Sequence, residues 1–375
     1  MTSKRLRVAT AVLLLSAAGL AITAAPALAG DNHRSDPIEI QKQGSFMIGG
    51  SVLTAANGDT FHGDHAYVQY QIPKKPRKLP LVMWHGGGQF SKTWESTPDG
   101  REGYQSIFLR RDFSTYIFDQ PRRGRAGRST VGTTINVTPN ESGSWNLFRL
   151  GTWVPPGAPT FFPNVQFPRD AASVDQYFRQ QTPNTGPGAQ AVVVGAIAKL
   201  FDKIGPAVLI SHSASGQTSW PTAIASPNVK AVICYETSFY VFPEGEVPAP
   251  IPTGFFNVTG ASVPLADFLK LTTIPIQLVF GDNIPTTPST IPGLDLWRGT
   301  IILAQKFVDA INRHGGDAQL LHLPTIGVRG NTHFAFSDLN NQKIADLLSK
   351  FLKSKGLDKY PGRNGHDDDD DHHHH

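Results

Sequence analysis

The stretch that decides the fold covers residues 207–216 and reads AVLISHSASG. Its first four residues form a short apolar run, as expected for a strand that is buried on both faces of a sheet. The small polar residues that follow predict a sharp turn into a helix-compatible segment, 217–224. A turn of this kind exposes its central residue, here Ser213, as a candidate nucleophile. It needs small residues two positions before and after the nucleophile; Ser211 and Ser215 meet that need, although glycine is usual at both.

Similar apolar runs recur along the chain and end in glycine or polar residues. The runs that we interpret as strands are 44–50, 65–72, 79–84, 115–118, 229–235, 276–280 and 320–323. Segments with apolar residues at helical spacing lie between several of them, at 103–111, 189–204, 301–311 and 344–352. This alternation predicts an α/β fold in which a mostly parallel central sheet carries helices on both faces.

Composition excludes several classes of protein. The 375 residues are 39% hydrophobic and 17% charged, which argues against a disordered chain and a coiled coil. The 36 glycines and 29 prolines predict many turns and long loops. Without residues 1–29 and 366–375, the chain has 31 basic and 25 acidic residues, a net charge of about +6. The basic residues form no stripe with interleaved aromatic side chains, so we expect no nucleic-acid partner.

The N-terminus has the pattern of a signal peptide. Basic residues within 4–7 precede an apolar run at 8–22, and Ala27-Leu28-Ala29 has the small-x-small pattern of a cleavage site. A membrane anchor is the alternative, but the run is short and Pro26 interrupts it. We therefore expect residues 1–29 to be removed, leaving a secreted or periplasmic protein with no stable membrane anchor.

The remaining chain is predicted to form one domain, residues 30–365. Cys234 is its only cysteine, so it forms no internal disulfide. The tail, 366–375, contains five Asp and five His residues. Such a tract can bind divalent metals, be a disordered tail or be partly an added tag, and it carries no information on catalysis.

Two long segments fit neither the strand nor the helix pattern. They cover approximately residues 130–188 and 237–272, and both are rich in aromatic residues and proline. A structureless loop of this length is unusual inside a compact domain unless it has a function. We interpret both segments as cap insertions over the carboxyl edge of the sheet, where open α/β sheets bind ligands. The alternative is a structural flap that does not contact substrate.

A glycine-rich turn, His85-Gly86-Gly87-Gly88, follows the run at 79–84. Glycines let backbone N–H groups approach a ligand oxygen closely. The N–H groups of Gly87, Gly88 and Ala214 are therefore candidate donors of an oxyanion hole. A simple turn or a phosphate loop is the alternative, but no Gly-Lys-Ser/Thr string follows, as a phosphate loop requires.

The candidate base is His333, in Gly330-Asn331-Thr332-His333. It follows the last predicted strand and precedes the last predicted helix, and a serine needs such a base to become reactive. Two residues are candidates for the acid that orients it. Glu236 ends one predicted strand and Asp282 ends the next, so either carboxylate could reach His333.

Other residues have a functional and a structural interpretation. Trp94 and Glu95 either line the pocket or brace the glycine-rich turn. Four arginines gather at Arg122, Arg123, Arg125 and Arg128. They either attract an anionic substrate or, as we favour, pair with carboxylates such as Glu95 or Asp99.

Several of these strings together resemble the α/β-hydrolase superfamily over essentially the whole mature chain. Within it, the sequence looks like a small group of bacterial esterases related to the Alcaligenes esterase. The resemblance is carried by His85-Gly86 with Thr93-Trp94-Glu95-Ser96-Thr97-Pro98-Asp99-Gly100-Arg101, Asp119-Gln120 with Gly124-Arg125, residues 211–216, and Gly330-Asn331-Thr332-His333 with Asn340-Asn341. In that group the acid is a Glu after the sixth strand, which implies Glu236 here. The pair Gly87-Gly88 and Gln89 depart from the group's oxyanion loop.

The resemblance implies a secreted serine esterase with a Ser213-His333-Glu236 triad and an acyl-enzyme intermediate. We expect a small-molecule ester substrate of apolar or aromatic character, and neither a metal nor an organic cofactor. A lactonase or an acyltransferase using the same triad is one alternative. A catalytically inactive exported protein that binds ligands on a hydrolase fold is another.

Overall fold

The computed structural model describes residues 37–135 and 140–362. Contacts divide the chain into Met1–Pro37 and Ile38–His375, and almost all described residues belong to the second unit. The predicted signal peptide, 1–29, and the Asp/His tail, 366–375, lie outside the described residues.

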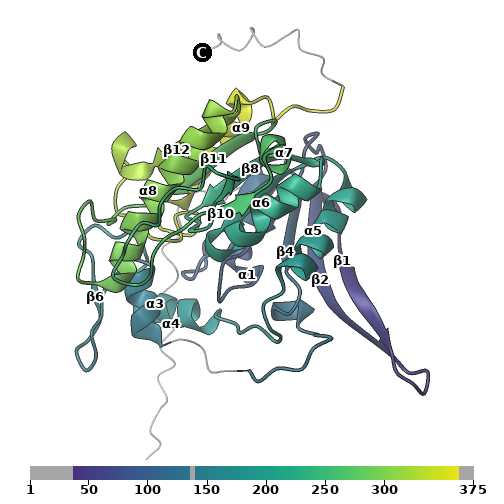
Figure 1. Ribbon diagram of the computed structural model, residues 1–375, viewed down its shortest axis with the longest axis horizontal. Helices are drawn as coiled ribbons and strands as arrows, with labels where there is room; N and C mark the ends of the chain where they lie inside the picture. The colour runs from purple at the N-terminus through teal and green to yellow at the C-terminus, as the bar shows by residue number, and fades with distance from the viewer. Residues whose placement is uncertain (1–36, 136–139, 363–375) are drawn as a thin grey trace, which may run out of the picture. The chain divides into compact units, whose positions relative to one another are not determined.

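An eight-stranded sheet forms the centre of the second unit, in the order β1-β2-β4-β3-β7-β8-β11-β12 (Figure 1). Strands β1, β2 and β4 pair antiparallel, and every pairing from β4 to β12 is parallel. The strands are β1 Ile40–Thr54, β2 Thr60–Pro73, β3 Leu81–Trp84, β4 Thr115–Asp119, β7 Ala207–His212, β8 Val229–Tyr235, β11 Pro275–Phe280 and β12 Asp317–His322. The predicted α/β fold with a mostly parallel sheet is confirmed.

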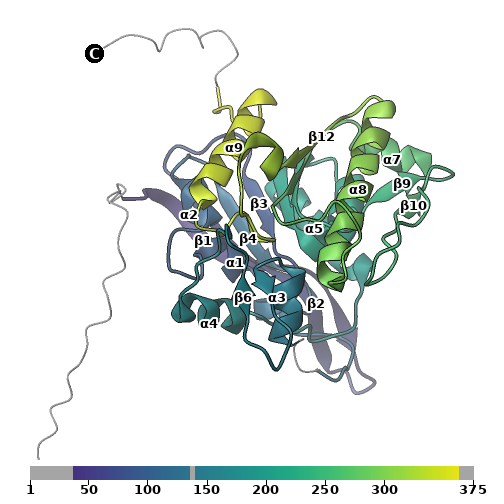
Figure 2. The same cartoon turned by 90° about the vertical axis from the view of Figure 1, so that its left-hand side faces the viewer.

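Helices cover both faces of this sheet because its central strands are apolar on both sides. In β3, Val82 and Trp84 face one core, and Leu81 and Met83 face the other. The first core lies under α5, α6, α7 and α8, and the second under α2 and α9; Figure 2 shows α8 and α9 on opposite sides. These helices are α2 Tyr104–Leu109, α5 Gln190–Ile204, α6 Gly216–Ala225, α7 Leu265–Leu271, α8 Pro292–Arg313 and α9 Asn341–Ser354.

All predicted strands and helices form, but some are longer than their patterns indicated. Strands β1 and β2 make a hairpin that extends well beyond its expected ends, and Figure 1 shows it projecting from the sheet. Its outer part has no core beneath it, so no apolar alternation marks it. Helix α8 begins nine residues before the predicted start, with Pro292 in its first turn, where a proline needs no N–H partner.

The two segments predicted as cap insertions contain short elements. The first holds α3 Glu141–Leu147, β5 Gly151–Thr152, β6 Thr160–Phe161 and α4 Ala171–Arg179. The second holds β9 Val241–Pro243, β10 Ala261–Val263 and α7. Their sequences lack a long apolar period, because each short element buries only a few side chains. One further short helix, α1 Lys92–Glu95, follows the glycine-rich turn.

Parallel pairing brings several loop residues to one edge of the sheet. Trp84 of β3 pairs with Ser211 of β7, and His212 pairs with Tyr235 of β8. The glycine-rich turn, Ser213 and Glu236 therefore all leave the sheet at the carboxyl edge, the usual ligand site of such folds. In the described part of the chain, none of the helices combines the length and apolar character that crossing a membrane requires.

Phe307 of α8 is the centre of the first core, where its ring lies 4.7 Å from that of Trp220 and 5.2 Å from that of Tyr240. We expect Phe307→Ala to lower the free energy of unfolding by about 3–5 kcal/mol, because it leaves a cavity among rigid rings. Replacing the neighbouring exposed Lys306 by Ala should change it by less than about 0.5 kcal/mol. Urea denaturation measures both; an equal, small effect would contradict this assignment of the core.

Candidate active site

Ser213 lies at the turn between β7 and α6 in a strained conformation. Its φ is 55°, in the left-handed region that non-glycine residues seldom adopt and that costs of order 1–3 kcal/mol. Ser211 is fully buried and its hydroxyl contacts Cys234 Sγ at 3.0 Å, so a larger side chain has no space there. The Ser215 hydroxyl accepts from the His212 N–H at 2.9 Å and stabilises the turn. The small residues around Ser213 are thus explained by close packing.

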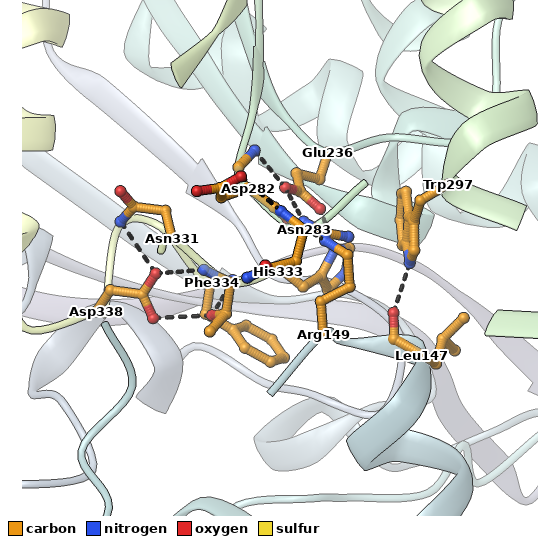
Figure 3. A network of polar contacts seen from close by, with 12 residues as sticks. Leu147, Arg149, Glu236, Asp282, Asn283, Trp297, Asn331, His333, Phe334 and Asp338 are labelled. Carbon is orange, nitrogen blue, oxygen red and sulfur yellow. Dashed lines mark hydrogen bonds and ion pairs between the residues drawn. The ribbon is translucent and has the colours of Figure 1, made fainter. Parts of the chain in front are cut away.

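His333 lies in the loop between β12 and α9, and its side chain is fully buried. Its Nδ1 is 2.8 Å from Glu236 Oε2, and Figure 3 shows the two side chains pointing toward each other. The imidazole stacks on Phe148 with ring centroids 4.8 Å apart and contacts Trp297 on another side at 4.6 Å. These contacts fix both the position and the plane of the ring.

The Glu236 carboxylate is fully buried and accepts three hydrogen bonds. Oε1 accepts from the Gly281 N–H at 2.6 Å and from Arg149 Nη2, and Oε2 accepts from His333. Burial alone would raise the pKa of Glu236, but the Arg149 charge and the His333 hydrogen bond hold that pKa below its ordinary value. Burial also lowers the pKa of His333, against the opposing effect of Glu236. At neutral pH the pair is therefore a carboxylate and a neutral imidazole.

Arg149 is a residue of this site that the sequence reasoning missed. Its side chain is fully buried, and its Nε donates to the Asp282 carbonyl at 2.8 Å in addition to the ion pair with Glu236. The guanidinium also lies 5.1 Å from the centre of the Trp297 ring. A lone arginine in the aromatic segment around Trp145 and Trp153 is the signal that could have marked it, since such surroundings do not solvate a charge.

The Asp282 carboxylate is engaged elsewhere. Its Oδ2 accepts from the Gly330 N–H and its Oδ1 from the Asn283 N–H, each at 2.8 Å. Asp282 thus holds the start of the loop that carries His333, whereas Glu236 contacts the imidazole. Between the two acids that the residues left open, the geometry favours Glu236.

A second buried acid supports the same loop. Asp338 accepts from the Thr332 N–H at 2.7 Å, from the Thr332 hydroxyl at 2.8 Å and from Asn331 Nδ2 at 3.0 Å (Figure 3). Burial raises the pKa of Asp338 to about 7. It fixes the two residues that precede His333, and sequence reasoning did not identify it.

His212 connects Ser213 to the His333 loop. Its Nε2 is 3.0 Å from the His333 carbonyl oxygen, and the two imidazole centroids are 4.5 Å apart. His333 Nε2 is buried without a hydrogen-bond partner among the described residues. The expected hydrogen bond between this nitrogen and the Ser213 hydroxyl is therefore not formed in this structure. The contacts between His212 and His333 are what connect the two loops.

Gln89 holds the glycine-rich turn next to the β7–α6 turn that carries Ser213. The Gln89 Oε1 atom accepts from the Gly86 N–H at 3.0 Å and lies 3.0 Å from His212 Nδ1. Gly88 has a φ of 67°, and a Cβ there would lie 2.7 Å from Gln181 Oε1. In the described part of the chain, the N–H groups of Gly87 and Gly88 have no acceptor. Gln89, one of the residues at which this sequence departs from the oxyanion loop of the esterase group it resembles, thus positions the turn.

A cavity of about 720 Å³ opens at this edge of the sheet. Ser213, Ala214, Gly87 and Gly88 all line it, so the candidate nucleophile and the three candidate oxyanion donors share one space. The remaining lining comes largely from α3, the end of α4 and the residues after it, with Phe255 from the second insertion. These residues include Leu147, Phe148, Phe178, Gln181, Thr182, Asn184, Arg123, Glu141, Asn146 and Ile291.

The structure corrects the interpretation of Trp94 and Glu95 as pocket residues. Trp94 is fully buried and packs on Phe336, with ring centroids 4.2 Å apart. Glu95 lies 3.7 Å from Arg125 Nη2. Neither side chain lines the cavity.

The structure also separates the four arginines. Arg122 pairs with Asp64 at 2.7 Å and Arg125 pairs with Asp119 at 3.1 Å, as the structural interpretation predicts. Asp99, another expected partner, pairs instead with Arg101 at 2.6 Å. Arg128 is exposed, and Arg123 is buried without an ion pair in the described residues. Within those same residues, no three His, Cys, Asp or Glu side chains gather in a way that could hold a metal ion.

Comparisons with known proteins agree with the observed fold. No family model matches the chain. It is 25% identical over 338 residues to a protein described as probable secreted lipase phiG from Fungal sp. (strain ATCC 74256), over 80% of this chain and 88% of the relative. It superposes on the solved structure of a bacterial esterase with a TM-score of 0.68 and 28% identity, over 86% of this chain and 98% of the esterase. With the fold, these similarities identify an α/β hydrolase of the carboxylic ester hydrolase class.

Arg149 generates a prediction about pH dependence. Its positive charge lowers the pKa of His333, so Arg149→Met should raise that pKa. A base must be neutral to act, so the acid limb of the kcat/KM profile should move to higher pH. Arg149→Lys keeps the charge and should move the limb less. The exposed Arg179→Met is the matched control and should leave it in place. An unchanged limb in Arg149→Met would show that the guanidinium does not act on His333.

Proposed function

We propose that this protein is an exported serine esterase that uses Ser213 as nucleophile, His333 as general base and Glu236 as the acid that orients it. One observation carries the proposal. A buried imidazole bonds a carboxylate through Nδ1, its Nε2 has no partner among the described residues, and it contacts His212, which directly precedes a serine at a strained strand-to-helix turn. In such a combination the carboxylate orients the imidazole, and the imidazole takes the proton of the serine hydroxyl and makes it reactive.

The first half of the reaction forms an acyl-enzyme. Ser213 Oγ attacks the ester carbonyl carbon while His333 Nε2 takes the hydroxyl proton. Glu236 keeps the proton of Nδ1 in place and stabilises the imidazolium that forms. As the tetrahedral intermediate collapses, His333 returns its proton to the leaving alcohol oxygen. The C–O bond to the alcohol breaks and Ser213 carries the acyl group.

The second half repeats these steps with water. His333 takes a proton from water, the hydroxide attacks the acyl carbon, and the acid leaves as the Ser213 hydroxyl regains its proton. Glu236 must stay ionised throughout, which the Arg149 ion pair favours.

We propose that a local adjustment brings the Ser213 hydroxyl to His333 Nε2. Rotation about the Ser213 Cα–Cβ bond changes the direction of its hydroxyl without moving the backbone, and catalytic hydrogen bonds often tighten only when substrate is bound. The close contacts of the preceding residue, His212, with His333 support a short path.

The N–H groups of Gly87, Gly88 and Ala214 are proposed as the oxyanion donors. They lie at the same cavity as Ser213, and a Cβ on Gly87 would be 3.3 Å from Ala214 Cβ, so the two sides of the hole are close. Each such donor contributes a few kcal/mol to transition-state stabilisation in related chemistry, about 2.7–4 kcal/mol.

The lining of the cavity supports an ester with an apolar part. Leu147, Phe148 and Phe178 come from the first insertion, and Phe255 from the second. We therefore propose that segments 130–188 and 237–272 act as a cap over the site. Export is proposed from the signal pattern of residues 1–29, and the name of the fungal relative, a probable secreted lipase, supports it.

Covalent labelling tests the nucleophile. The full-length protein should react with a fluorophosphonate probe and hydrolyse a p-nitrophenyl ester. Ser213→Ala should abolish labelling, and both Ser213→Ala and His333→Ala should lower kcat by roughly 10³-fold or more. Ser106→Ala, on α2, serves as the control and should keep both activities. Failure of the unmodified protein to label would indicate the inactive binding protein instead. Transfer of the acyl group to added alcohol in place of water would indicate an acyltransferase, and a preference for cyclic esters a lactonase.

A pair of isosteric variants tests the acid. Glu236→Gln keeps the shape of the side chain but removes its negative charge. The amide can no longer fix the proton on His333 Nδ1 or stabilise the imidazolium, so kcat should fall by about 10⁴-fold. Asp282→Asn should lower kcat by no more than about tenfold, because that carboxylate bonds backbone N–H groups near the loop and lies 4.0 Å from Arg329, and it does not bond His333. Steady-state kinetics of the two purified variants, with circular dichroism to confirm folding, provide the comparison. The reverse ranking would assign the role to Asp282.

A further inference from the structure

Arg123 combines three properties that the proposed mechanism does not use. It is 5% exposed, it lines the cavity that contains Ser213, and its guanidinium has no carboxylate at ion-pair distance in the described part of the chain. Its Nε donates to Asn184 Oδ1 at 2.7 Å, as does its Nη2, and its Nη1 donates to the Gln89 carbonyl at 3.1 Å. All its protein partners are thus neutral acceptors.

The neighbouring arginines show how different this is. Arg122 forms a two-point contact with the Asp64 carboxylate, at 2.7 and 2.8 Å. Arg125 contacts Asp119 at 3.1 Å and Glu95 at 3.7 Å. Within one short segment, therefore, Arg122 and Arg125 have carboxylate partners, and Arg123, which lines the cavity, has none in the described part of the chain.

The Asp119 charge acts on Arg123 and opposes the effect of burial on its pKa, but the Asp119 carboxylate forms no ion pair with Arg123 and its oxygens bond other groups. Its Oδ1 accepts from the Ser91 N–H at 2.7 Å, and its Oδ2 accepts from the Arg125 N–H at 2.8 Å. Burial lowers the pKa of Arg123 to about 10, so the guanidinium is charged at neutral pH. Burial also lowers the pKa of His85, whose ring senses the charges of Arg123 and Asp119, to about 4. This ring is therefore neutral at neutral pH and adds no charge beside Arg123.

A buried charge without an ion pair destabilises a fold by several kcal/mol unless a binding partner compensates it. A guanidinium has five N–H groups, and Arg123 makes three hydrogen bonds within residues 37–135 and 140–362, so two N–H groups have no acceptor there and can serve a ligand. The contacts with Asn184 and Gln89 hold its plane fixed. Such a pre-positioned planar donor matches a carboxylate, which accepts two parallel hydrogen bonds.

We propose that the cavity binds esters that carry a free carboxylate, and that Arg123 pairs with this carboxylate while Ser213 attacks the ester carbonyl. The inference rests on the proposed function and defines its substrate class: half-esters of dicarboxylic acids, or esters of hydroxy acids, with an apolar connecting part. Leu147, Phe148 and Phe178 pack on that apolar part. Glu141 also lines the cavity, but its exposed carboxylate is screened by solvent and opposes an anion only weakly.

The test uses matched esters and the full-length protein. One series varies the acyl end, as p-nitrophenyl esters ending in a carboxylate (hydrogen glutarate), a methyl group (pentanoate) or an ammonium group (5-aminopentanoate). The other varies the alcohol end, as butyrate esters of 4-hydroxybenzoate and of phenol. In at least one series, kcat/KM for the carboxylate should exceed that of the neutral ester by roughly tenfold to a hundredfold, through KM. The ammonium ester should be the poorest substrate.

Variants assign the preference to Arg123. In Arg123→Gln the ratio of kcat/KM for the anionic ester to that for the neutral ester should fall by roughly tenfold to a hundredfold, and Arg123→Lys should restore part of it. Arg128→Gln removes an exposed arginine of the same segment that does not line the cavity, and the ratio should stay as in the unmodified protein.

The outcomes separate this inference from the proposed function. If neutral esters are hydrolysed and neither series shows a preference for carboxylate, the substrate class is wrong and the esterase assignment stands. Equal losses on anionic and neutral esters in Arg123→Gln would also overturn it, since the arginine would then support the fold or the oxyanion turn. If no ester of any charge is hydrolysed and no probe labels Ser213, the proposed function itself fails.

Discussion

The hydrogen bond between Glu236 and His333 is the interaction on which the rest of the site depends. It places a carboxylate and an imidazole together where both are fully buried. A buried carboxylate is costly unless its oxygens are satisfied, and here the Gly281 N–H and Arg149 satisfy them. The ion pair with Arg149 keeps the acid ionised, and burial keeps the imidazole neutral. The pair is therefore prepared to accept one proton at Nε2.

The sheet explains why these residues meet although they are far apart in the chain. Parallel strands β3, β7, β8 and β11 end at one edge, and each contributes the loop that follows it. The glycine-rich turn, Ser213 and Glu236 come directly from those loops, and His333 comes from the segment after β12. The backbone at Ser213 and Glu236 is strained, with φ of 55° and 50°, and the surrounding packing holds both in place.

Much of this arrangement could be predicted from the sequence, because it follows from short apolar strands that end in unusual residues. The strands, the larger helices and the position of Ser213 after β7 have such local signals. Arg149 and Asp338 have no such signals. The role of Arg149 depends on its contact with Glu236, 87 positions away, and the role of Asp338 depends on how the His333 loop folds around it. The sequence left two interpretations of Trp94 open for the same reason: whether an aromatic side chain faces a cavity or a core depends on tertiary packing. The environment of Arg123 has no local signal either, because it depends on Arg122 pairing with Asp64 and on Arg125 pairing with Asp119.

The protonation state of His333 tests the account most directly. In protein labelled with ¹⁵N-histidine, NMR at neutral pH should show His333 as the neutral tautomer with the proton on Nδ1, in a strong hydrogen bond that shifts this proton far downfield. Glu236→Gln should remove that downfield signal. A proton on Nε2, or a doubly protonated ring at neutral pH, would contradict the claim that this buried pair is prepared to take a proton from Ser213.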